Sequence, residues 1–302
     1  MRKLRIKQVD AFTDRVFGGN PAGVVSCADE LTDQEMQQIA NEMNLSETAF
    51  VLPSKKADFR IRWFTPKTEV LFCGHATVAS LHVLAEEDKF GMDNDGTFSF
   101  RIETMIGILN VDVEKRLKTT RVILQSPPID LVREQLNIGE LAAALRIRVT
   151  DIDGNYPIMR DRPMDYVYVP LRKLDALKQL SYDFDQLESF GNKSHIKGFT
   201  IITKETFERD SSVHSRFFSP YYGVREDPTT GPSHGPLAVY LIINHVVSLD
   251  SNHEAEIKAE QGDIMGRPGR MIVKLTLQRD GTYTTKLISR AVTVLDGELL
   301  LP

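Results

Sequence analysis

Hydrophobic positions in the first half of the chain follow both a strand period and a helix period. Alternation predicts an opening strand over residues 4–12 and another over Glu47–Leu52, which Pro53 stops. Between them, Thr32 and Glu35 form a capping box ahead of a helical stripe. A nearly continuous apolar run predicts a second helix over Gly74–Glu86. Further strands are expected at Val24–Val25, after the turn-rich residues 18–23, and at Asp58–Phe64, Phe98–Ile102, Ile108–Val113 and Arg121–Leu124.

The second half repeats this mixture of many strands and few helices. We expect a short helix near Leu136–Leu145, mostly helical structure over Leu171–Phe190, and an apolar helix over Pro232–Asn244. Each half thus pairs one notably apolar helix with many strands, which favours an α+β fold in which a sheet wraps around a central helix. The regular βα alternation of a doubly wound sheet is absent. The expected strands are Asp165–Leu171, Gly198–Thr203, Val213–Phe218, Met271–Leu277, Tyr283–Ile288 and Arg290–Leu295.

A short motif occurs twice, about half a chain apart. The letters RWFTP at 62–66 return as RFFSP at 216–220, and each copy leads through a valine to a glycine that opens an apolar segment. The second glycine, Gly231, comes three residues later in its copy than Gly74 does, and the extra residues include Glu226 and Asp227. Self-similarity of this kind predicts two like domains. It also suggests two helix N-termini that face one cleft.

The repeat and the prolines together suggest domain boundaries. Ser126, Pro127 and Pro128 form the best linker candidate, because two prolines continue neither a helix nor a ladder. We therefore expect an N-terminal repeat domain over residues 1–125 and a C-terminal repeat domain over 128–289. A last strand over about 290–302 is expected to return to the first domain.

Composition excludes several classes of function. The chain has 302 residues and a formal net charge of −5, with acidic and basic residues interspersed. No lysine or arginine block is long enough for a nucleic-acid surface, and no apolar run spans a bilayer. The N-terminus leads directly into strand alternation rather than a signal peptide. Two cysteines make no disulfide framework, so we expect a cytoplasmic protein without nucleic-acid or membrane partners.

The two glycine helix starts are candidate anion sites. A helix N-terminus presents unpaired amide groups and a partial positive charge, and it binds a carboxylate without a basic side chain. Gly74 and Gly231 have no Cβ to keep a ligand from the backbone, and Pro232 fits the first turn, where its missing N–H costs nothing. The alternative is a pair of ordinary glycine helix entries.

Three titratable residues are candidates for proton transfer. Glu47 begins an apolar strand, and burial there would raise its pKa and make it a usable proton carrier; the alternative is a solvated strand end. His75 lies in the first turn of its helix, where the dipole favours a neutral imidazole. Asp227 precedes Pro228 and could equally belong to a simple turn.

The remaining motifs argue against a catalytic thiol, a nucleotide-binding loop and a metal site. Cys73 adjoins Gly74, but the second repeat has Thr230 in that place, so a small buried residue is favoured over a catalytic thiol. The glycines at 18–23 have no following Gly-Lys-Ser/Thr, so they form no P-loop. The seven histidines show no metal-ligand spacing, and we expect neither a metal nor a cofactor.

Taken together, the motifs resemble the PhzF-like phenazine-biosynthesis family, within the diaminopimelate-epimerase-like fold. The matching segments follow one another in order over nearly the whole chain. They are VDAFT at 9–13, GNPAGV at 19–24, NLSETAF at 44–50, FTP at 64–66, CGHAT at 73–77, EDPTTG at 226–231, and the glycine-rich stretch 262–269.

The resemblance implies two similar domains, each a β-barrel-like sheet around a central helix, with a cofactor-free active site between them and a homodimeric assembly. It implies that Glu47 is the acid/base and that His75 and Asp227 assist it. Backbone amides at the helix starts would hold the substrate carboxylate. The expected substrate-binding residues are Asn20, Gly74, Ala76, Gly231 and Ser233.

One position departs from the family pattern. Pro232 stands where the phenazine enzymes typically carry a serine that contacts the substrate, and Ser233 follows one residue later. Ser233 or His234 could compensate, and Thr230 could supply a capping hydroxyl.

We therefore expect a cofactor-independent isomerase that moves a proton between carbons of a small carboxylate-bearing substrate, similar to trans-2,3-dihydro-3-hydroxyanthranilate isomerase. Two alternatives stay open from the sequence. One is an epimerase or racemase of a small amino or hydroxy acid, and the other is a metabolite-binding protein without catalysis.

Overall fold

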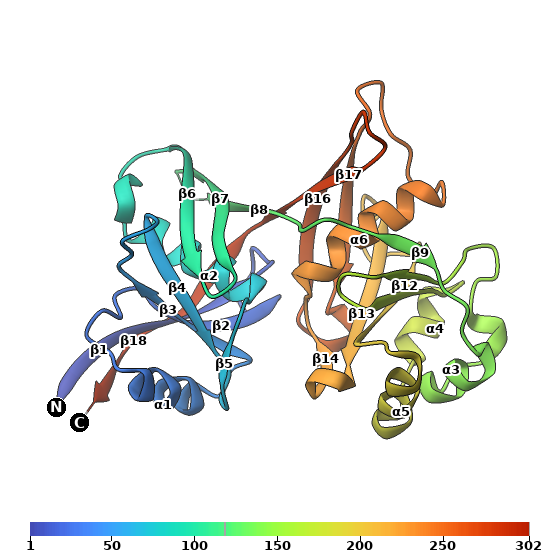
Figure 1. Ribbon diagram of the computed structural model, residues 1–302, viewed down its shortest axis with the longest axis horizontal. Helices are drawn as coiled ribbons and strands as arrows, with labels where there is room; N and C mark the ends of the chain where they lie inside the picture. Colours follow the sequence, from blue (N-terminus) through green and yellow to red (C-terminus); the bar gives the residue numbers. More distant parts are fainter. Residues whose placement is uncertain (118, 302) are drawn as a thin grey trace. The chain divides into compact units, whose positions relative to one another are not determined.

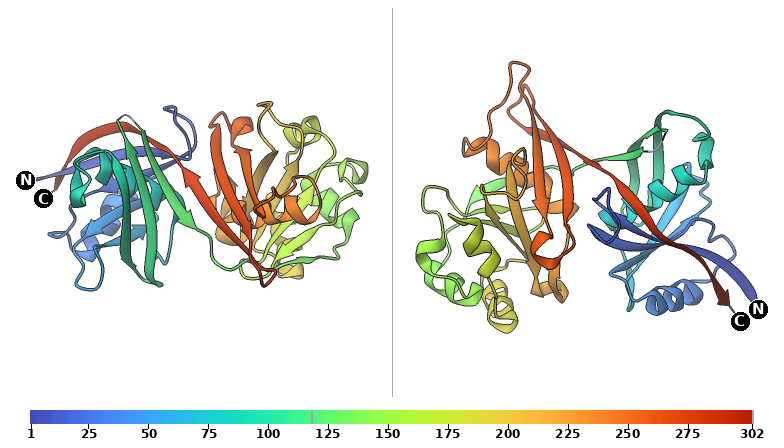
Figure 2. Two further views of the ribbon diagram at one scale, coloured as in Figure 1. Left: turned by 90° about the horizontal axis from the view of Figure 1, so that it is seen from above. Right: turned by 180° about the vertical axis from the view of Figure 1, so that it is seen from behind.

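The computed structural model describes residues 1–117 and 119–301, and its backbone divides into two compact units (Figure 1). The first unit comprises Met1–Gln125 together with Ile288–Pro302, and the second comprises Ser126–Leu287. The last strand, β18 (Ala291–Leu301), belongs to the first unit because it pairs antiparallel with β1 (Arg2–Ala11). Figures 1 and 2 show these two strands side by side, with the chain ends next to each other.

In the first unit, a mixed sheet runs in the order β18, β1, β2, β3, β4, β6, β7, β8. Among these described strand pairs, β2–β3 and β4–β6 are parallel, and each is joined through a helix, as a parallel connection requires. The remaining elements are β2 (Asn20–Val25), α1 (Asp33–Met43), β3 (Glu47–Leu52), β4 (Phe59–Phe64), β5 (Glu69–Val70), α2 (Gly74–Glu86), η1 (Lys89–Gly91), β6 (Gly96–Thr104), β7 (Gly107–Arg116) and β8 (Thr119–Gln125).

The second unit repeats this order of pairing. Its strands β9, β10, β11, β12, β13, β15 and β16 are neighbours in that order, and the parallel pairs β11–β12 and β13–β15 again enclose helices. Its elements are β9 (Leu131–Arg133), α3 (Ile138–Leu145), η2 (Val149–Asp151), β10 (Met159–Asp161), β11 (Tyr166–Pro170), α4 (Leu174–Gln179), α5 (Phe184–Ser194), β12 (Gly198–Thr203), β13 (Val213–Ser219), η3 (Pro220–Tyr222), β14 (Val224–Asp227), α6 (Gly231–Ile243), β15 (Glu254–Gln261), η4 (Asp263–Met265), β16 (Gly269–Leu277) and β17 (Tyr283–Ser289).

The helices α2 and α6 are the buried centres of their units. Both are apolar around most of their circumference, and every residue from Ala76 to Ala85 and from Ser233 to Ile242 is buried. A helix that is hydrophobic all round is stable only inside a core. The sequence prediction of one central helix per repeat therefore agrees with the structure.

The repeat extends to side-chain contacts. Arg62 of β4 forms a bidentate pair with Glu69, with both N···O distances 2.7 Å. Arg216 of β13 pairs with Glu226 in the same way, at 2.8 Å for both contacts. Because Glu226 takes the place of Glu69, the three extra residues of the second copy lie ahead of it, in the turn between β13 and β14. They do not include Glu226 and Asp227, as the sequence had suggested, since both belong to β14.

Two local predictions were wrong. Residues 20–23 were expected in a turn, but Asn20–Val25 form β2, because pairing with β1 on one side and β3 on the other outweighs the turn preference of Asn, Pro and Gly. The helical stretch expected over Leu171–Phe190 is broken into α4 and α5, and Asp183 caps the second helix by accepting from the Gln186 amide.

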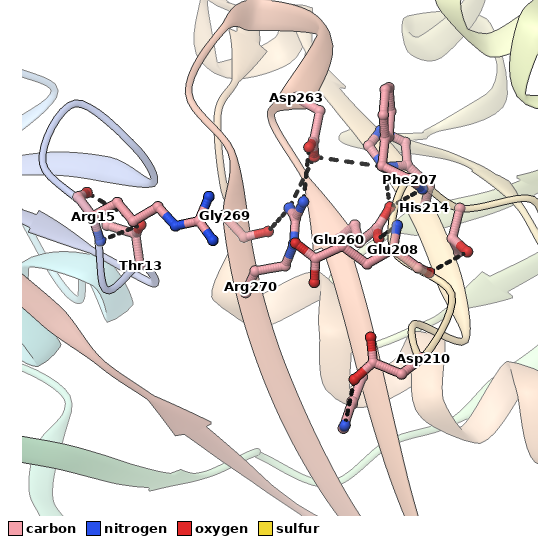
Figure 3. A network of polar contacts seen from close by, with 12 residues as sticks. Thr13, Arg15, Phe207, Glu208, Asp210, His214, Glu260, Asp263, Gly269 and Arg270 are labelled. Atoms are coloured by element: carbon pink, nitrogen blue, oxygen red, sulfur yellow. Dashed lines mark hydrogen bonds and ion pairs between the residues drawn. The ribbon is translucent and has the colours of Figure 1, made fainter.

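A charge network stabilises the second unit near β13, β15 and β16 (Figure 3). The carboxylate of Glu260 accepts hydrogen bonds from the amides of Phe207 and Glu208, at 2.8 and 2.7 Å, and lies 3.1 Å from Nδ1 of His214. Arg270 in turn forms a bidentate pair with Asp263. Both Glu260 and His214 are fully buried, so the network is part of the core.

Within the described part of the chain, no helix combines the length and the apolar character needed to cross a membrane.

Candidate active site

The start of α2 gathers the candidate groups of the first unit. Cys73 is the N-cap in extended conformation and makes no side-chain capping bond. The first-turn amides of Gly74, His75 and Ala76 have no partner within the helix, because backbone bonding begins with the Thr77 amide, which donates to the Cys73 carbonyl at 3.1 Å. This helix start can therefore receive an anion, as the sequence analysis proposed.

Glu47 and His75 are brought together by the sheet. Glu47 is the first residue of β3, in register with Ala22 of β2, and its side chain is largely but not completely buried. Its Oε2 lies 3.2 Å from Nε2 of His75. Two residues far apart in sequence thus form one acid–imidazole pair beside the α2 amides.

His75 has two further polar neighbours. Ser46 Oγ lies 3.2 Å from the same Nε2, and Cys73 Sγ lies 3.4 Å from Nδ1. An ionised Glu47 only accepts hydrogen bonds, so Nε2 of His75 is the donor in that contact.

Two other predicted residues of the first unit, Asn20 and Ala76, are buried. Asn20 begins β2, two residues before the register partner of Glu47, and is almost completely inaccessible. Ala76 is fully buried, so only its backbone could contact a ligand.

In the second unit, the loop before α6 is held by side chains. Thr230 Oγ1 donates to Asp227 Oδ2 at 2.5 Å. Gln261 donates from Nε2 to the Asp227 carbonyl, at 2.7 Å, and accepts at Oε1 from the Thr230 amide, at 3.1 Å. Asp227 is therefore a positioned carboxylate at the end of β14 rather than a freely rotating turn residue.

The glycine-rich stretch supports the same loop. Gly262 has a φ of 90°, a left-handed conformation that side-chain-bearing residues rarely adopt. A methyl group on Gly269 would overlap the Thr229 side chain. These two glycines allow residues 262–269 to pack closely on the segment that joins Asp227 to α6.

The α6 helix start differs from the sequence expectation. Gly231 is buried at the first helical position, and Ser233 is fully buried, with its hydroxyl donating to the Thr230 carbonyl at 2.9 Å. His234 also turns inward, with Nδ1 2.7 Å from that carbonyl, and burial lowers the pKa of His234 to about 4. Neither side chain takes the place of the hydroxyl that the typical family serine would carry at position 232. Thr230 makes no capping bond, because its hydroxyl donates to Asp227.

Sequence reasoning missed Ser46 and Gln261. The one sequence feature that could have identified them is their position next to a motif, since Ser46 precedes Glu47 and Gln261 precedes the glycine-rich stretch. Cys73 was judged a small buried residue; it is buried, but it also contacts His75.

Two groups of potential metal ligands occur among the described residues, although the spacing of the histidines did not suggest any. In each group one ligand atom per residue lies within 4.8 Å of the others. The groups are Glu47, Cys73 and His75 in the first unit, and His214, Glu260 and Asp263 in the second.

Comparison with known proteins defines the class of enzyme. An uncharacterised isomerase of Clostridium acetobutylicum is 35% identical over 100% of this chain and 99% of its own. The trans-2,3-dihydro-3-hydroxyanthranilate isomerase of Pseudomonas aeruginosa is 33% identical over 88% of both chains. The protein is an isomerase.

The family follows from the same comparison. A family model described as "Phenazine biosynthesis-like protein" matches residues 9–297. The crystal structure of a phenazine biosynthesis protein of the PhzF family from Bacillus anthracis covers 100% of both chains at 31% identity, with a TM-score of 0.88. The chain belongs to the phenazine biosynthesis-like (PhzF) family, and the fold predicted from the resemblance is confirmed.

Proposed function

We propose that the protein is a cofactor-independent isomerase in which Glu47 moves a proton between two carbons of a small carboxylic acid. The observation that carries the proposal is the 3.2 Å contact between Glu47 Oε2 and His75 Nε2 beside the first turn of α2. The contact supports the proposal because a carboxylate lies beside a helix start whose first amides have no partner within the helix, and membership in a family of isomerases supports the reaction class.

The proposed reaction uses one carboxylate twice. Glu47 takes a proton from a carbon that a neighbouring carboxylate and double bond make acidic, and the C–H electron pair moves into the conjugated system. The protonated Glu47, which is partly exposed and exchanges its proton with solvent, then delivers a proton to a different carbon, so that substrate and product are isomers and the enzyme is regenerated. A positioned general acid/base contributes about 10²–10⁴ in rate.

The surrounding groups would hold the substrate during this transfer. The amides of Gly74 and Ala76 would bind its carboxylate and offset the negative charge that develops, a contribution of about 3 kcal/mol for a well-placed donor. His75 orients Glu47. From the family resemblance alone, we further propose that Asn20, Gly231 and Asp227 bind polar groups of the substrate. The internal hydrogen bond of Ser233 argues against a direct role for its hydroxyl.

The substrate class is proposed from the chemistry and from one relative. The Pseudomonas aeruginosa relative is named for trans-2,3-dihydro-3-hydroxyanthranilate, an unsaturated carboxylic acid. We propose a substrate of that class. Pro232 at the start of α6 argues that the substrate is not identical to that of the phenazine enzymes. The expected homodimer and cytoplasmic location stay predictions.

The test is deuterium uptake from D₂O into a panel of small carboxylic acids that includes trans-2,3-dihydro-3-hydroxyanthranilate. Wild type, Glu47→Gln and Glu86→Gln are compared. Glu86 is the matched control because it also pairs with a histidine of α2, with Glu86 Oε1 3.1 Å from His82 Nε2.

Uptake by wild type and Glu86→Gln, with loss in Glu47→Gln, would support the proposal. Equal uptake by all three proteins would contradict the role of Glu47. The labelled carbon decides between outcomes, because an isomerase labels a new position whereas an epimerase labels the carbon that it inverts.

A further inference from the structure

Three chemically different ligand groups meet at the start of α2. They are the thiol of Cys73, the imidazole of His75 and the carboxylate of Glu47, and one ligand atom from each lies within 4.8 Å of the other two. The closest distances to His75 Nε2 are 3.2 Å from Glu47 Oε2 and 3.9 Å from Cys73 Sγ. The resemblance to the family assigns a proton-transfer role to two of these residues and none to the thiol.

The Glu47–His75 distance is close to an edge of a tetrahedral zinc site. Zinc binds sulfur at about 2.3 Å and nitrogen or oxygen at about 2.0–2.2 Å, so its ligand atoms are separated by about 3.4–3.6 Å. Cys73 Sγ lies 3.4 Å from Nδ1 and 3.9 Å from Nε2, so the thiol has to rotate toward Nε2 to share an ion with Glu47.

The type of donor selects the ion. A thiolate excludes Mg²⁺ and Ca²⁺, which prefer oxygen, whereas sulfur, imidazole and carboxylate together suit Zn²⁺. A thiolate and a carboxylate also neutralise the double charge of the ion. Three protein ligands leave a fourth position for water or an anion, which is the pattern of an open rather than a structural site.

Accessibility distinguishes this group from the second candidate. The side chains of Glu47 and His75 are 19% and 11% exposed, whereas Cys73 is buried, so an ion reaches the group from the side of Glu47 and His75. In the second unit, His214 and Glu260 are both 0% exposed. There the Glu260 carboxylate is bound by two backbone amides and Asp263 by Arg270 (Figure 3), so those oxygens already have partners.

We propose that Cys73, His75 and Glu47 form a binding site for Zn²⁺, and that a bound ion inhibits the enzyme. Binding releases the thiol proton of Cys73 and replaces the hydrogen bond between His75 and Glu47. The Glu47 oxygen then ligates the ion and cannot accept a proton from carbon. The inhibitory part rests on the proposed function, whereas the binding part does not.

Cobalt(II) provides a direct probe of binding, since it occupies zinc sites and thiolate ligation gives an intense near-ultraviolet charge-transfer band. The purified protein is titrated with CoCl₂ as wild type, Cys73→Ser and Cys27→Ser. Cys27 is the matched control, because it is the other cysteine of the chain and is exposed. We expect one Co²⁺ per chain with the band in wild type and Cys27→Ser, its loss in Cys73→Ser, and displacement by Zn²⁺.

A band that persists in Cys73→Ser, or no band in wild type, would overturn the proposed site. Because Cys73→Ser could fold poorly, X-ray absorption of the zinc-loaded wild type and Cys27→Ser gives a second measurement. One sulfur at about 2.3 Å with nitrogen or oxygen at about 2.0–2.2 Å is expected. A shell without sulfur would contradict the proposal.

Inhibition is measured separately. Zn²⁺ should block deuterium uptake by wild type and Cys27→Ser, and the inhibitory concentration should rise at least about tenfold in Cys73→Ser, since loss of even an indirect supporting partner weakens metal affinity by about 10–100-fold. Zinc binding without any loss of uptake would refute inhibition. Failure of Glu47→Gln to lose activity would refute the proposed function and leave the spectroscopic result standing.

Discussion

The two repeats begin their central helices differently, although the strands around them pair in the same order. At α2, three successive residues, Gly74, His75 and Ala76, carry amides without a partner inside the helix, and His75 points to an acid. At α6, Pro232 has no N–H, and the Ser233 amide bonds back to Thr230 at 3.3 Å. Two helix starts in the same strand framework thus differ, since the start of α2 leaves three successive amides without a partner inside the helix, whereas the start of α6 lacks one N–H and bonds another back to Thr230.

The histidines show the same contrast. His75 is partly exposed and lies between a carboxylate and a thiol, whereas His234 is fully enclosed and bonded to a backbone carbonyl. In the proposed function, this contrast favours proton transfer in the first unit and substrate positioning in the second.

The largest expected effect is on catalysis by Glu47. Glu47→Gln keeps the size and hydrogen-bonding capacity of the side chain but cannot carry the proton, so kcat should fall by about 10²–10⁴. Asp227→Asn should have a smaller effect, which steady-state kinetics on the two variants would show. A greater loss in Asp227→Asn would reverse the assignment of the two helix starts.

The next effect is acid destabilisation through His234. Its pKa is about 4 in the folded protein and 6.5 in the reference state, so the unfolded chain binds the proton first as the pH falls. The stability that the folded protein gains by keeping His234 neutral is fully present above pH 6.5 and is lost progressively towards pH 4. Between pH 7 and pH 5, the loss of stability amounts to about 2 kcal/mol.

Urea unfolding at the two pH values measures this loss in wild type and His234→Leu. The variant cannot titrate at this position, so its stability should fall less on acidification. The same pH dependence in both proteins would show that His234 is not the group responsible.

A smaller effect is expected from His75→Ala. The substitution removes one hydrogen bond to a charged group, worth about 1.5–3 kcal/mol, which corresponds to about 10–100-fold in kcat. The same lost bond should also lower the melting temperature, and thermal unfolding measures that part separately. An unchanged kcat would show that Glu47 needs no partner.

The smallest effect is expected from Pro232→Ser. Loss of the proline should cost about 0.4–1 kcal/mol of stability by loosening the unfolded chain. The new amide and hydroxyl should lower KM for the substrate, since the α6 start then resembles the typical family pattern. Denaturant unfolding and steady-state kinetics test both parts, and a raised KM would show that Pro232 itself shapes the substrate site.

The sequence predicts the central helices well because their apolar character determines their burial. The expected helix Gly74–Glu86 coincides with α2, and α6 begins at Gly231, one residue before the prediction. β2 was missed at Asn20–Gly23 because its strand conformation comes from neighbours distant in sequence.

The site residues were named mainly through the family resemblance, and their contacts could not be read from spacing. Glu47 and His75 meet because β3 and α2 pack in one unit. The inward turn of Ser233 depends on helix geometry after Pro232, since its hydroxyl reaches the carbonyl of Thr230. Such contacts depend on angles and register that single residues do not reveal.

The most direct test of the account is the rate at which wild type, Glu47→Gln and Asp227→Asn place deuterium from D₂O on a substrate carbon. We predict that Glu47→Gln abolishes measurable exchange while Asp227→Asn slows it and retains the same labelled position. Exchange in Glu47→Gln at the wild-type rate would contradict the claim that Glu47 carries the proton.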